Sequence, residues 1–205
     1  MKNKSIYEKL LGAEFQGLHP KLQKRYQISE GNPIIAKGTM HHITGGPKWL
    51  YPLWIIGTMC KLVFPERGEN IPFTITNRAY QTDKGTEEVY WERAFHFPKK
   101  KRYFNATMSF DAKSHIIKDY LGDPSPLYSD LRLTVEEDGS ITIDSVKQRL
   151  VIGKLEIPLP KWMYGVATVQ EAYDEKMAAY TISVHVHNRL IGTVFAYEGV
   201  FQLHE

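Results

Sequence analysis

One arginine occupies a position where a charged side chain is costly. Arg93 takes the middle position of a series in which apolar residues recur at every second place, as on one face of a strand: Val89, Trp91, Phe95 and Phe97. If the apolar face points inward, so does the guanidinium. Because a charge buried alone is strongly destabilising, Arg93 needs an internal partner or a ligand.

Two explanations account for a buried Arg93. The first is an ion pair inside the protein, with Glu171, Asp119 or Asp130 as the carboxylate. The second is an anchor for the carboxylate or phosphate of a ligand, which a guanidinium binds through two parallel hydrogen bonds. The two explanations are compatible, because a carboxylate can hold one edge of the guanidinium while a ligand takes the other.

Further polar residues are candidates for the same site. Asn77 shares a strand face with Ile75 and can neighbour Arg93 across a hairpin. Arg149 lies at a change of phase between apolar positions, where an exposed residue is favoured over an inward cation. Hydroxyls that point into a cavity or cap the core can come from several tyrosines: Tyr80, Tyr90, Tyr103, Tyr173, Tyr180 and Tyr197.

The sequence contains none of the common catalytic motifs. G-x-S-x-G, the P-loop, G-x-G-x-x-G and H-E-x-x-H are all absent, so no catalytic residue and no cofactor is predicted. Asp119 and Asp123 flank Gly122, and either would serve as a general acid or base if desolvated. A carboxylate in a turn is the favoured interpretation. Cys60 falls in an apolar run and is interpreted as a small core hydrophobe.

A pair of histidines has a spacing that suits a metal. His185 and His187 lie on one face of a strand, but a metal site needs three or four ligands, and nothing in the sequence brings others to them. The alternate positions define the core face of this strand: Tyr180, Ile182, Val184 and Val186. We therefore expect the histidines to face solvent and predict no metal site.

These residues must be positioned by strands. Beyond the first third of the chain apolar residues recur at every second place, and Asp83-Lys84-Gly85 and Asp138-Gly139 mark hairpin turns. A change of phase suggests a bulge near Ser145. About nine strands joined by short turns must curl or close to protect their edges. The predicted fold is mainly β (α+β): a strongly curved antiparallel sheet or barrel, with N-terminal helices covering a face or an end, able to hold one small ligand.

The first third of the chain has a different pattern. Apolar residues from Tyr7 to Tyr26 recur at three- to four-residue spacing, which predicts short helices. A short strand from Ile34 to His41 is expected to follow. The apolar run from Trp49 to Phe64 is interpreted as a buried helix, with a helix lying in a membrane surface as the alternative. It is shorter than the ~20 residues of a membrane-spanning helix.

Length and composition favour one intracellular domain. The 205 residues are assigned to a single domain, 1–205, in which a mainly helical part, 1–64, packs on a β-sheet formed by 65–205. One cysteine rules out an internal disulfide and no signal peptide is recognised, so a cytoplasmic location is expected. With 26 basic and 23 acidic residues the charge is too balanced to favour nucleic acid as a partner.

Short motifs are spread over most of the chain beyond about Lys37: Phe64-Pro65, Ile71-Pro72, Trp91-x-Arg93-x-Phe95, Arg102-Tyr103-Phe104, Gln148-Arg149-Leu150, Ile157-Pro158-Leu159-Pro160, Glu171-Ala172-Tyr173, Gly192 and Tyr197-x-Gly199. Together they resemble an uncharacterised bacterial domain-of-unknown-function family, which also occurs fused behind dehydrogenase-like nucleotide-binding domains. The resemblance supplies no mechanism. It implies a metabolic or ligand-handling role and places four residues in family motifs: Trp91, Arg93, Arg149 and Glu171.

The sequence favours a binding domain. We expect a small amphipathic, anionic molecule to occupy an apolar cavity of the curved sheet, with these ligand-binding residues: Arg93, Trp91, Arg149, Glu171, Asn77 and Tyr197. One alternative is an enzyme acting on such a ligand, with Asp119 or Glu171 as acid or base. The other is an accessory domain at a membrane surface, which would use the run from Trp49 to Phe64. The oligomeric state stays open.

Overall fold

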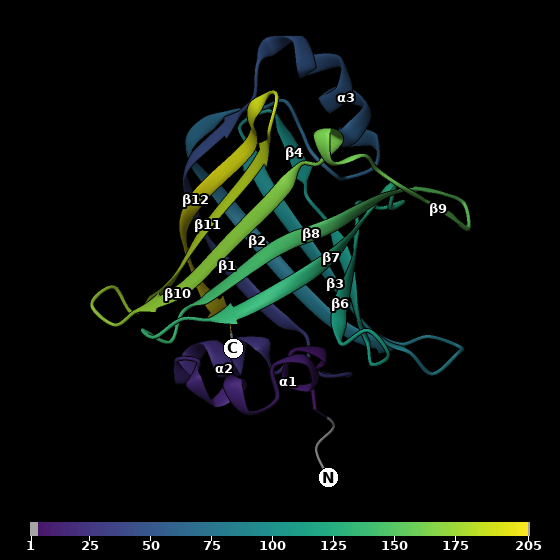
Figure 1. The fold of residues 1–205 in the computed structure, drawn as a ribbon. Helices are drawn as coiled ribbons and strands as arrows, with labels where there is room; N and C mark the ends of the chain where they lie inside the picture. Colours follow the sequence, from purple (N-terminus) through teal and green to yellow (C-terminus); the bar gives the residue numbers. More distant parts are fainter. Residues whose placement is uncertain (1–3, 205) are drawn as a thin grey trace.

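The chain folds into an antiparallel β-barrel with short helices at both of its ends (Figure 1). The computed structural model describes residues 4–204. The helices are α1 (Ile6–Leu11), α2 (Pro20–Tyr26) and α3 (Tyr51–Met59), with the 3₁₀ turns η1 (Gly12–Gly17), η2 (Lys48–Leu50) and η3 (Lys161–Met163). The strands are β1 (Ile34–Gly45), β2 (Gly68–Gln81), β3 (Glu87–Phe97), β4 (Lys100–Tyr103), β5 (Ala106–Asp111), β6 (Ile116–Leu121), β7 (Leu127–Val135), β8 (Ile141–Ile152), β9 (Leu155–Pro158), β10 (Val166–Asp174), β11 (Ala179–Asn188) and β12 (Gly192–His204).

Ten of these strands close the barrel. Neighbours follow the order β10-β11-β12-β1-β2-β3-β5-β6-β7-β8, and β8 pairs with β10 through residues 141–144 and 168–171. The short strands β4 and β9 pair outside this ring, with β3 and β8. The prediction of a mainly β fold, an antiparallel barrel of about nine strands with N-terminal helices at one end, is confirmed. Closure leaves few backbone groups at open edges.

Aromatic side chains fill one side of the barrel interior. Strand alternation turns Phe95 of β3 inward, where its ring lies 5.0 Å from Phe73, 5.0 Å from Phe64 and 5.1 Å from Tyr197, measured between ring centroids. Phe195 of β12 extends this cluster, 5.0 Å from Phe64. The strands on the other side, β7, β8, β10 and β11, contribute smaller aliphatic residues to the interior. Aromatic rings therefore fill the interior around Phe73 and Phe95, and the cavity lies toward the strands on the other side.

The N-terminal helices close one end of the barrel, which we call the floor (Figure 1). A capping box starts α1: the Ser5 hydroxyl accepts from the backbone of Glu8 at 3.2 Å, and the Glu8 carboxylate accepts from the Ser5 amide at 2.8 Å. The apolar face of α1 and α2 is buried against the strands, with Tyr7, Leu22 and Tyr26 almost inaccessible. The predicted helical spacing from Tyr7 to Tyr26 thus marks the apolar residues that α1, η1 and α2 turn toward the barrel interior.

The opposite end, which we call the mouth, carries a correction. The run from Trp49 to Phe64 is not a buried helix: η2 and α3 end at Met59 and lie across the barrel end with one side in contact. Leu50, Trp54 and Gly57 are buried, whereas Trp49 is 66% exposed and Met59 77% exposed. The helix is apolar on all sides, so the side that faces solvent could not be predicted from its sequence. The expected strand from Ile34 continues to Gly45.

The predicted bulge near Ser145 is present, and β8 and β10 separate beyond it. Between the pairs Ser129–Gln148 and Leu131–Ser145, one residue of β7 faces two of β8, so the strand changes phase. Beyond this bulge β8 no longer pairs with β10, and side chains replace the ladder. Gln148 donates to the carbonyl of Gly165 at 2.7 Å and accepts from its amide at 2.9 Å. The Ser145 hydroxyl accepts from the amide of Ala167 at 2.7 Å.

A glycine allows two strands to approach closely. A Cβ atom on Gly199 of β12 would lie 2.2 Å from the carbonyl oxygen of Thr39 and 2.6 Å from the Cα of Met40 in β1. Backbone must therefore move, and we expect Gly199→Ala to lower the free energy of unfolding by about 1–3 kcal/mol, the usual cost of overpacking. Urea unfolding measures this. Gly45→Ala is the matched control, because its Cβ would meet only the side chain of Arg67, at 3.3 Å. Equal stability of both variants would contradict the prediction.

Candidate ligand-binding cavity

A cavity of about 490 Å³ lies inside the barrel, away from the aromatic cluster. Its walls are mainly aliphatic side chains of β6, β7, β8, β10 and β11, and it extends to the inner side of α3. Three charged residues interrupt this lining: Arg93, Asp119 and Glu171. The volume, and an apolar wall with a few polar groups, are typical of small-molecule sites.

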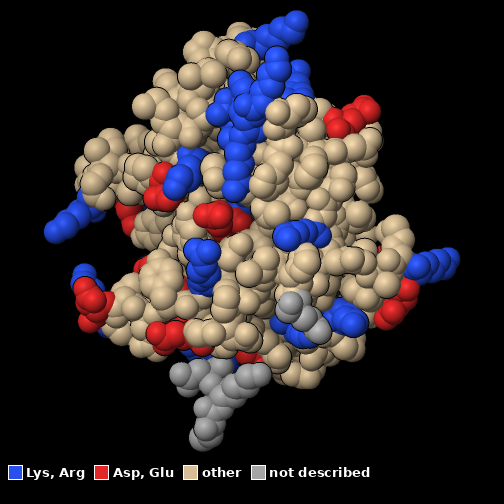
Figure 2. Space-filling model, turned by 180° about the vertical axis from the view of Figure 1, so that it is seen from behind, with Lys and Arg blue, Asp and Glu red and all other residues tan. Residues whose placement is uncertain are grey.

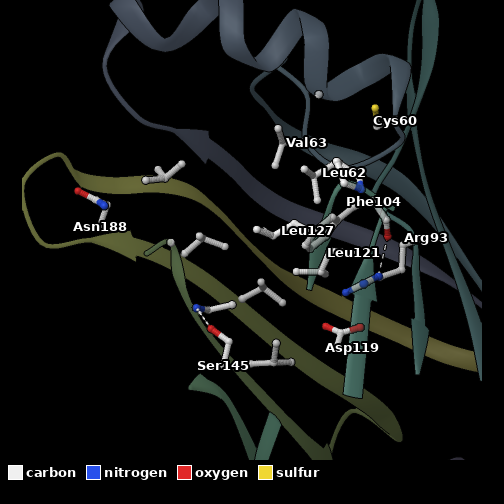
Figure 3. Close-up of a pocket in the computed structure, with 18 of the residues that line it drawn as sticks. Cys60, Leu62, Val63, Arg93, Phe104, Asp119, Leu121, Leu127, Ser145 and Asn188 are labelled. Atoms are coloured by element: carbon white, nitrogen blue, oxygen red, sulfur yellow. Dashed lines mark hydrogen bonds between the residues drawn. The ribbon is translucent and has the colours of Figure 1, made fainter. Parts of the chain in front are cut away.

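Arg93 points into the barrel, as the strand alternation predicts. Its side chain is 6% exposed, and its Nε donates to the carbonyl of Phe104 at 2.7 Å (Figure 3). The guanidinium carbon lies 4.2 Å from the centroid of the Phe104 ring, a distance that allows a cation–π contact. One edge of the guanidinium is therefore held by the protein, and the terminal nitrogens extend toward the cavity.

Asp119 shares the cavity with Arg93. The interpretation of Asp119 as a turn carboxylate is wrong: it lies in β6, between the inward residues Ile117 and Leu121, and is 5% exposed. Figure 3 shows its carboxylate next to the guanidinium of Arg93. Burial raises the pKa of Asp119 to about 7, and the positive charge of Arg93 opposes that rise. Its Oδ1 has no hydrogen-bond partner among residues 4–204.

Glu171 is paired with Arg25, an arginine whose burial was not predicted from the sequence. Arg25 of α2 is completely buried, and its Nε lies 3.7 Å from the carboxylate of Glu171. Its Nη1 donates to the side-chain oxygen of Asn77, and its guanidinium lies 4.7 Å from the ring centroid of Trp91. Of the three carboxylates considered as partners of Arg93, Glu171 therefore neutralises Arg25, and Asp130 accepts from the hydroxyl of Tyr128.

The six expected ligand-binding residues are divided by the structure. Trp91 and Glu171 line the cavity with Arg93, and Trp91 donates its Nε1 to the Tyr7 hydroxyl at 2.8 Å, at the floor. Asn77 holds Arg25 below the cavity, and Tyr197 is buried in the aromatic cluster. Arg149 is half-buried outside the lining, where it donates to Glu156 at 2.7 Å. The change of phase between apolar positions near Arg149 results from the bulge, and the Arg149 side chain does not point into the barrel.

The cavity opens at the mouth. Several of its lining residues are also exposed to solvent, among them Leu53 and Ile56 of α3 and Met163 of η3. Cys60, expected in the core, lines this region and is partly exposed. Asp123 does lie in a connection, between β6 and β7, and pairs with Lys61 at 2.6 Å. The mainly apolar lining of the cavity thus continues to the outside at the mouth.

Other kinds of site receive little support. His185 and His187 are exposed on the outer face of β11, as expected. Within residues 4–204 no three or more histidine, cysteine, aspartate or glutamate side chains gather as metal ligands would. None of the helices in the same range has the length and apolar character needed to cross a bilayer.

Comparison with known proteins gives two matches. A family model described as "Domain of unknown function (DUF4166)" matches residues 18–201. An uncharacterized protein of Bacillus subtilis (strain 168), YndH, is 44% identical over 201 residues, which are 98% of this chain and 98% of that protein. The family match begins just before the floor helix α2 and extends through the barrel into β12.

Proposed function

The chain belongs to the DUF4166 domain family, and we propose that its barrel binds a small amphipathic, anionic molecule. One observation carries the proposal: an apolar cavity of about 490 Å³ holds Arg93 and a buried, incompletely paired Asp119 on its wall. Polar groups of this kind fix the orientation of a ligand whose remaining surface is apolar.

The charges in the barrel favour an anion. Glu171 and Arg25 balance each other at the floor. Asp119, with a pKa of about 7, keeps its proton in a large fraction of molecules at neutral pH. In those molecules the charge of Arg93 is uncompensated, so a ligand carboxylate or phosphate would restore neutrality. The protonated Asp119 would then donate to the same head group.

The walls fit an apolar tail. From Arg93 toward the mouth the lining is mainly aliphatic, including Leu121, Leu127 and Val184, with Ser145 and Asn188 as polar exceptions. A ligand with its head at Arg93 would bury its tail along this wall. Burial of apolar surface supplies about 25 cal/mol per Å². The head group would contribute orientation and selectivity.

Substitution of Arg93 tests the proposal. We expect fatty or aromatic acids to raise the melting temperature of the protein, and Arg93→Ala to weaken their binding about tenfold or more, because a hydrogen bond to a charged group contributes about 1.5–3 kcal/mol. Displacement of a fluorescent fatty-acid analogue measures the affinities. Arg149→Ala is the matched control, since Arg149 lies outside the cavity.

A neutral ligand separates charge recognition from burial. The methyl ester of the tightest-binding acid should bind the native protein and Arg93→Ala with similar affinity. Equal binding of the free acid by both proteins would remove Arg93 from the site. Failure of every acid and ester to bind would argue against a carrier altogether.

An enzyme acting on the same ligand is the second candidate, favoured by Asp119. A carboxylate with a pKa near 7 beside a cavity has the properties of a general acid or base. Glu171 is less suited to this role, because Arg25 pairs with it. Mass spectrometry of a bound acid after long incubation separates the two functions: conversion that Asp119→Asn abolishes, without loss of binding, indicates catalysis.

The setting of this function is also part of the proposal. A cytoplasmic location is supported by the single cysteine, which leaves no disulfide to form within the chain. Fusion of such domains behind dehydrogenase-like nucleotide-binding domains would fit a ligand that a metabolic enzyme makes or consumes.

A further inference from the structure

Exposed apolar side chains gather at the mouth of the barrel. Among the exposed large hydrophobic residues of the described chain, all but Ile35, Tyr80 and Met177 lie there. We call the others the mouth rim: Trp49, Tyr51, Leu53, Ile55, Ile56 and Met59 on η2 and α3; Leu150, Ile152, Leu155, Ile157, Trp162, Met163 and Val166 around β9 and η3; and Leu190 between β11 and β12. Single exposed apolar residues are ordinary, but a gathering of this extent marks an interaction surface.

Basic residues accompany the mouth rim. Figure 2 shows lysine and arginine side chains concentrated at the α3 end of the molecule. The mouth connections and β4 carry Lys48, Lys61, Arg67, Lys99, Lys100, Lys101, Arg102, Lys154, Lys161 and Arg189. The acidic residues of the same segments are Glu66, Asp123 and Glu156, and each is held in an ion pair. The surface that the rim presents is therefore both apolar and positively charged.

The floor is close to balanced in charge. Its connections carry Glu30, Asp83, Glu136, Glu137, Asp138 and Glu175 together with Lys84, Lys113 and Lys176, and the floor helices carry Glu8 and Glu14 together with Lys9, Lys21, Lys24 and Arg25. The excess of positive charge therefore lies at the mouth, and the field of a negatively charged surface would orient the molecule with the mouth toward that surface.

We propose that the mouth rim docks on an anionic phospholipid bilayer. Trp49, Leu53 and Met59 would enter the boundary between head groups and acyl chains, and the surrounding lysines and arginines would contact the phosphates. Leu53, Ile56 and Met163 line the cavity as well as the rim, so docking would connect the cavity to the bilayer interior. This inference goes beyond ligand binding, because outward-facing rim residues such as Trp49 and Met59 do not line the cavity.

Charge favours a bilayer over a second copy of the chain. A dimer joined mouth to mouth would bring the basic residues of two copies together, and their repulsion would oppose association. A bilayer that contains anionic lipid offers the complementary charge and an apolar interior in one surface. Aromatic side chains at the rim, such as Trp49, Tyr51 and Trp162, are also those that prefer the interfacial region.

Vesicle sedimentation tests the proposal on the full chain. We expect the protein to sediment with vesicles of equal phosphatidylglycerol and phosphatidylcholine at low ionic strength, and the bound fraction to fall with added salt. Pure phosphatidylcholine should retain much less. Trp49 and Trp162 are exposed, so tryptophan emission should shift to shorter wavelength on binding.

Two variants at the mouth have matched controls at the floor. Trp49→Ser with Met59→Ser removes exposed apolar groups that do not line the cavity, and Met177→Ser is the control. Lys99→Glu with Lys154→Glu reverses exposed charges, and Lys84→Glu with Lys113→Glu is the control. Each mouth variant should weaken vesicle binding about tenfold or more. One basic residue near an anionic surface contributes about a fivefold factor, and exposed apolar side chains contribute through their burial in the interface.

The outcomes separate this inference from the cavity proposal. Displacement of the fluorescent fatty acid should be unchanged in the Trp49 and Met59 variant, because neither residue lines the cavity. Absence of vesicle binding by the native protein at low salt would overturn the inference, as would equal losses from mouth and floor variants. Light scattering that shows a dimer, split by the same mouth variant, would assign the rim to a second copy of the chain.

Discussion

Replacement of Arg25 by alanine is expected to lower the free energy of unfolding by about 3–5 kcal/mol, the usual result of removing one partner from a buried ion pair. Arg25 is completely buried between α2 and the floor of the barrel. Its loss leaves the carboxylate of Glu171 without its positive partner in an apolar interior and removes the hydrogen bond to Asn77. Urea unfolding of the purified variant measures the change.

Two comparisons separate the buried pair from ordinary effects of substitution. Arg78→Ala removes an exposed arginine of β2 and should change the free energy of unfolding by less than about 0.5 kcal/mol. Arg25→Met combined with Glu171→Leu replaces the ion pair by apolar groups and should recover most of the lost stability, because neither charge then remains buried. An Arg25→Ala protein as stable as the native one would show that Glu171 finds another partner or water.

Arg25 also shows where the sequence was insufficient. It lies next to Tyr26 and three residues after Leu22, both of which were expected on the inner helix face. That spacing was the available signal. A short helix rich in lysine and arginine usually turns such residues to solvent, whereas here the buried side chains of Glu171 and Asn77 give this guanidinium its partners.

Strand alternation was the more reliable guide. It predicted the buried position of Arg93 correctly, because strong apolar neighbours on both sides fix the inner face of β3. The same alternation runs through Ile117, Asp119 and Leu121, but the nearby Gly122 and a second aspartate favoured a turn. The strand β6 was missed for that reason, although Asp119 was among the carboxylates considered as internal partners of Arg93.

An apolar cavity was predicted from the barrel fold, but its position inside the barrel could not be predicted from the sequence. Whether a barrel of ten strands is hollow depends on how far its inward side chains reach, and here Phe64 and Phe95 fill one side only. The mouth had a similar difficulty. The run that begins at Trp49 contains apolar residues on every side, so its hydrophobicity did not reveal that one side faces out.

The pH dependence of stability is the second large expected effect, and Asp119 is its origin. In the folded protein its pKa is about 7, against 3.8 for the same group in the absence of burial. Between these values the folded state keeps a proton that the unfolded state releases, so stability decreases as the pH rises. This difference in pKa corresponds to about 4 kcal/mol in the free energy of unfolding. That stabilisation is fully present below about pH 4 and is lost by about pH 7.

Other carboxyl groups change the stability in the opposite direction as the pH rises, and their contribution must be subtracted. Lys61 lowers the pKa of Asp123, and Tyr120 and Arg149 lower that of Glu156, so both carboxylates add stability as the pH rises through about 4. The pH profile of the native protein is a sum of these contributions. Subtracting it from the profile of Asp119→Asn isolates Asp119, because all other groups occur in both proteins.

We therefore expect the free energy of unfolding of Asp119→Asn, taken relative to that of the native protein, to increase from pH 5 to pH 8 by a few kcal/mol. This is most of the contribution of about 4 kcal/mol expected from Asp119. Asparagine resembles the protonated acid in shape and carries no charge at either pH. Urea unfolding at a series of pH values gives both profiles, and parallel profiles would show that Asp119 is ionised throughout. The same proton links stability to the proposed ligand: an anionic acid should bind more tightly at pH 6 than at pH 8, and Asp119→Asn should remove that difference, since Arg93 then stands without a competing carboxylate at both pH values.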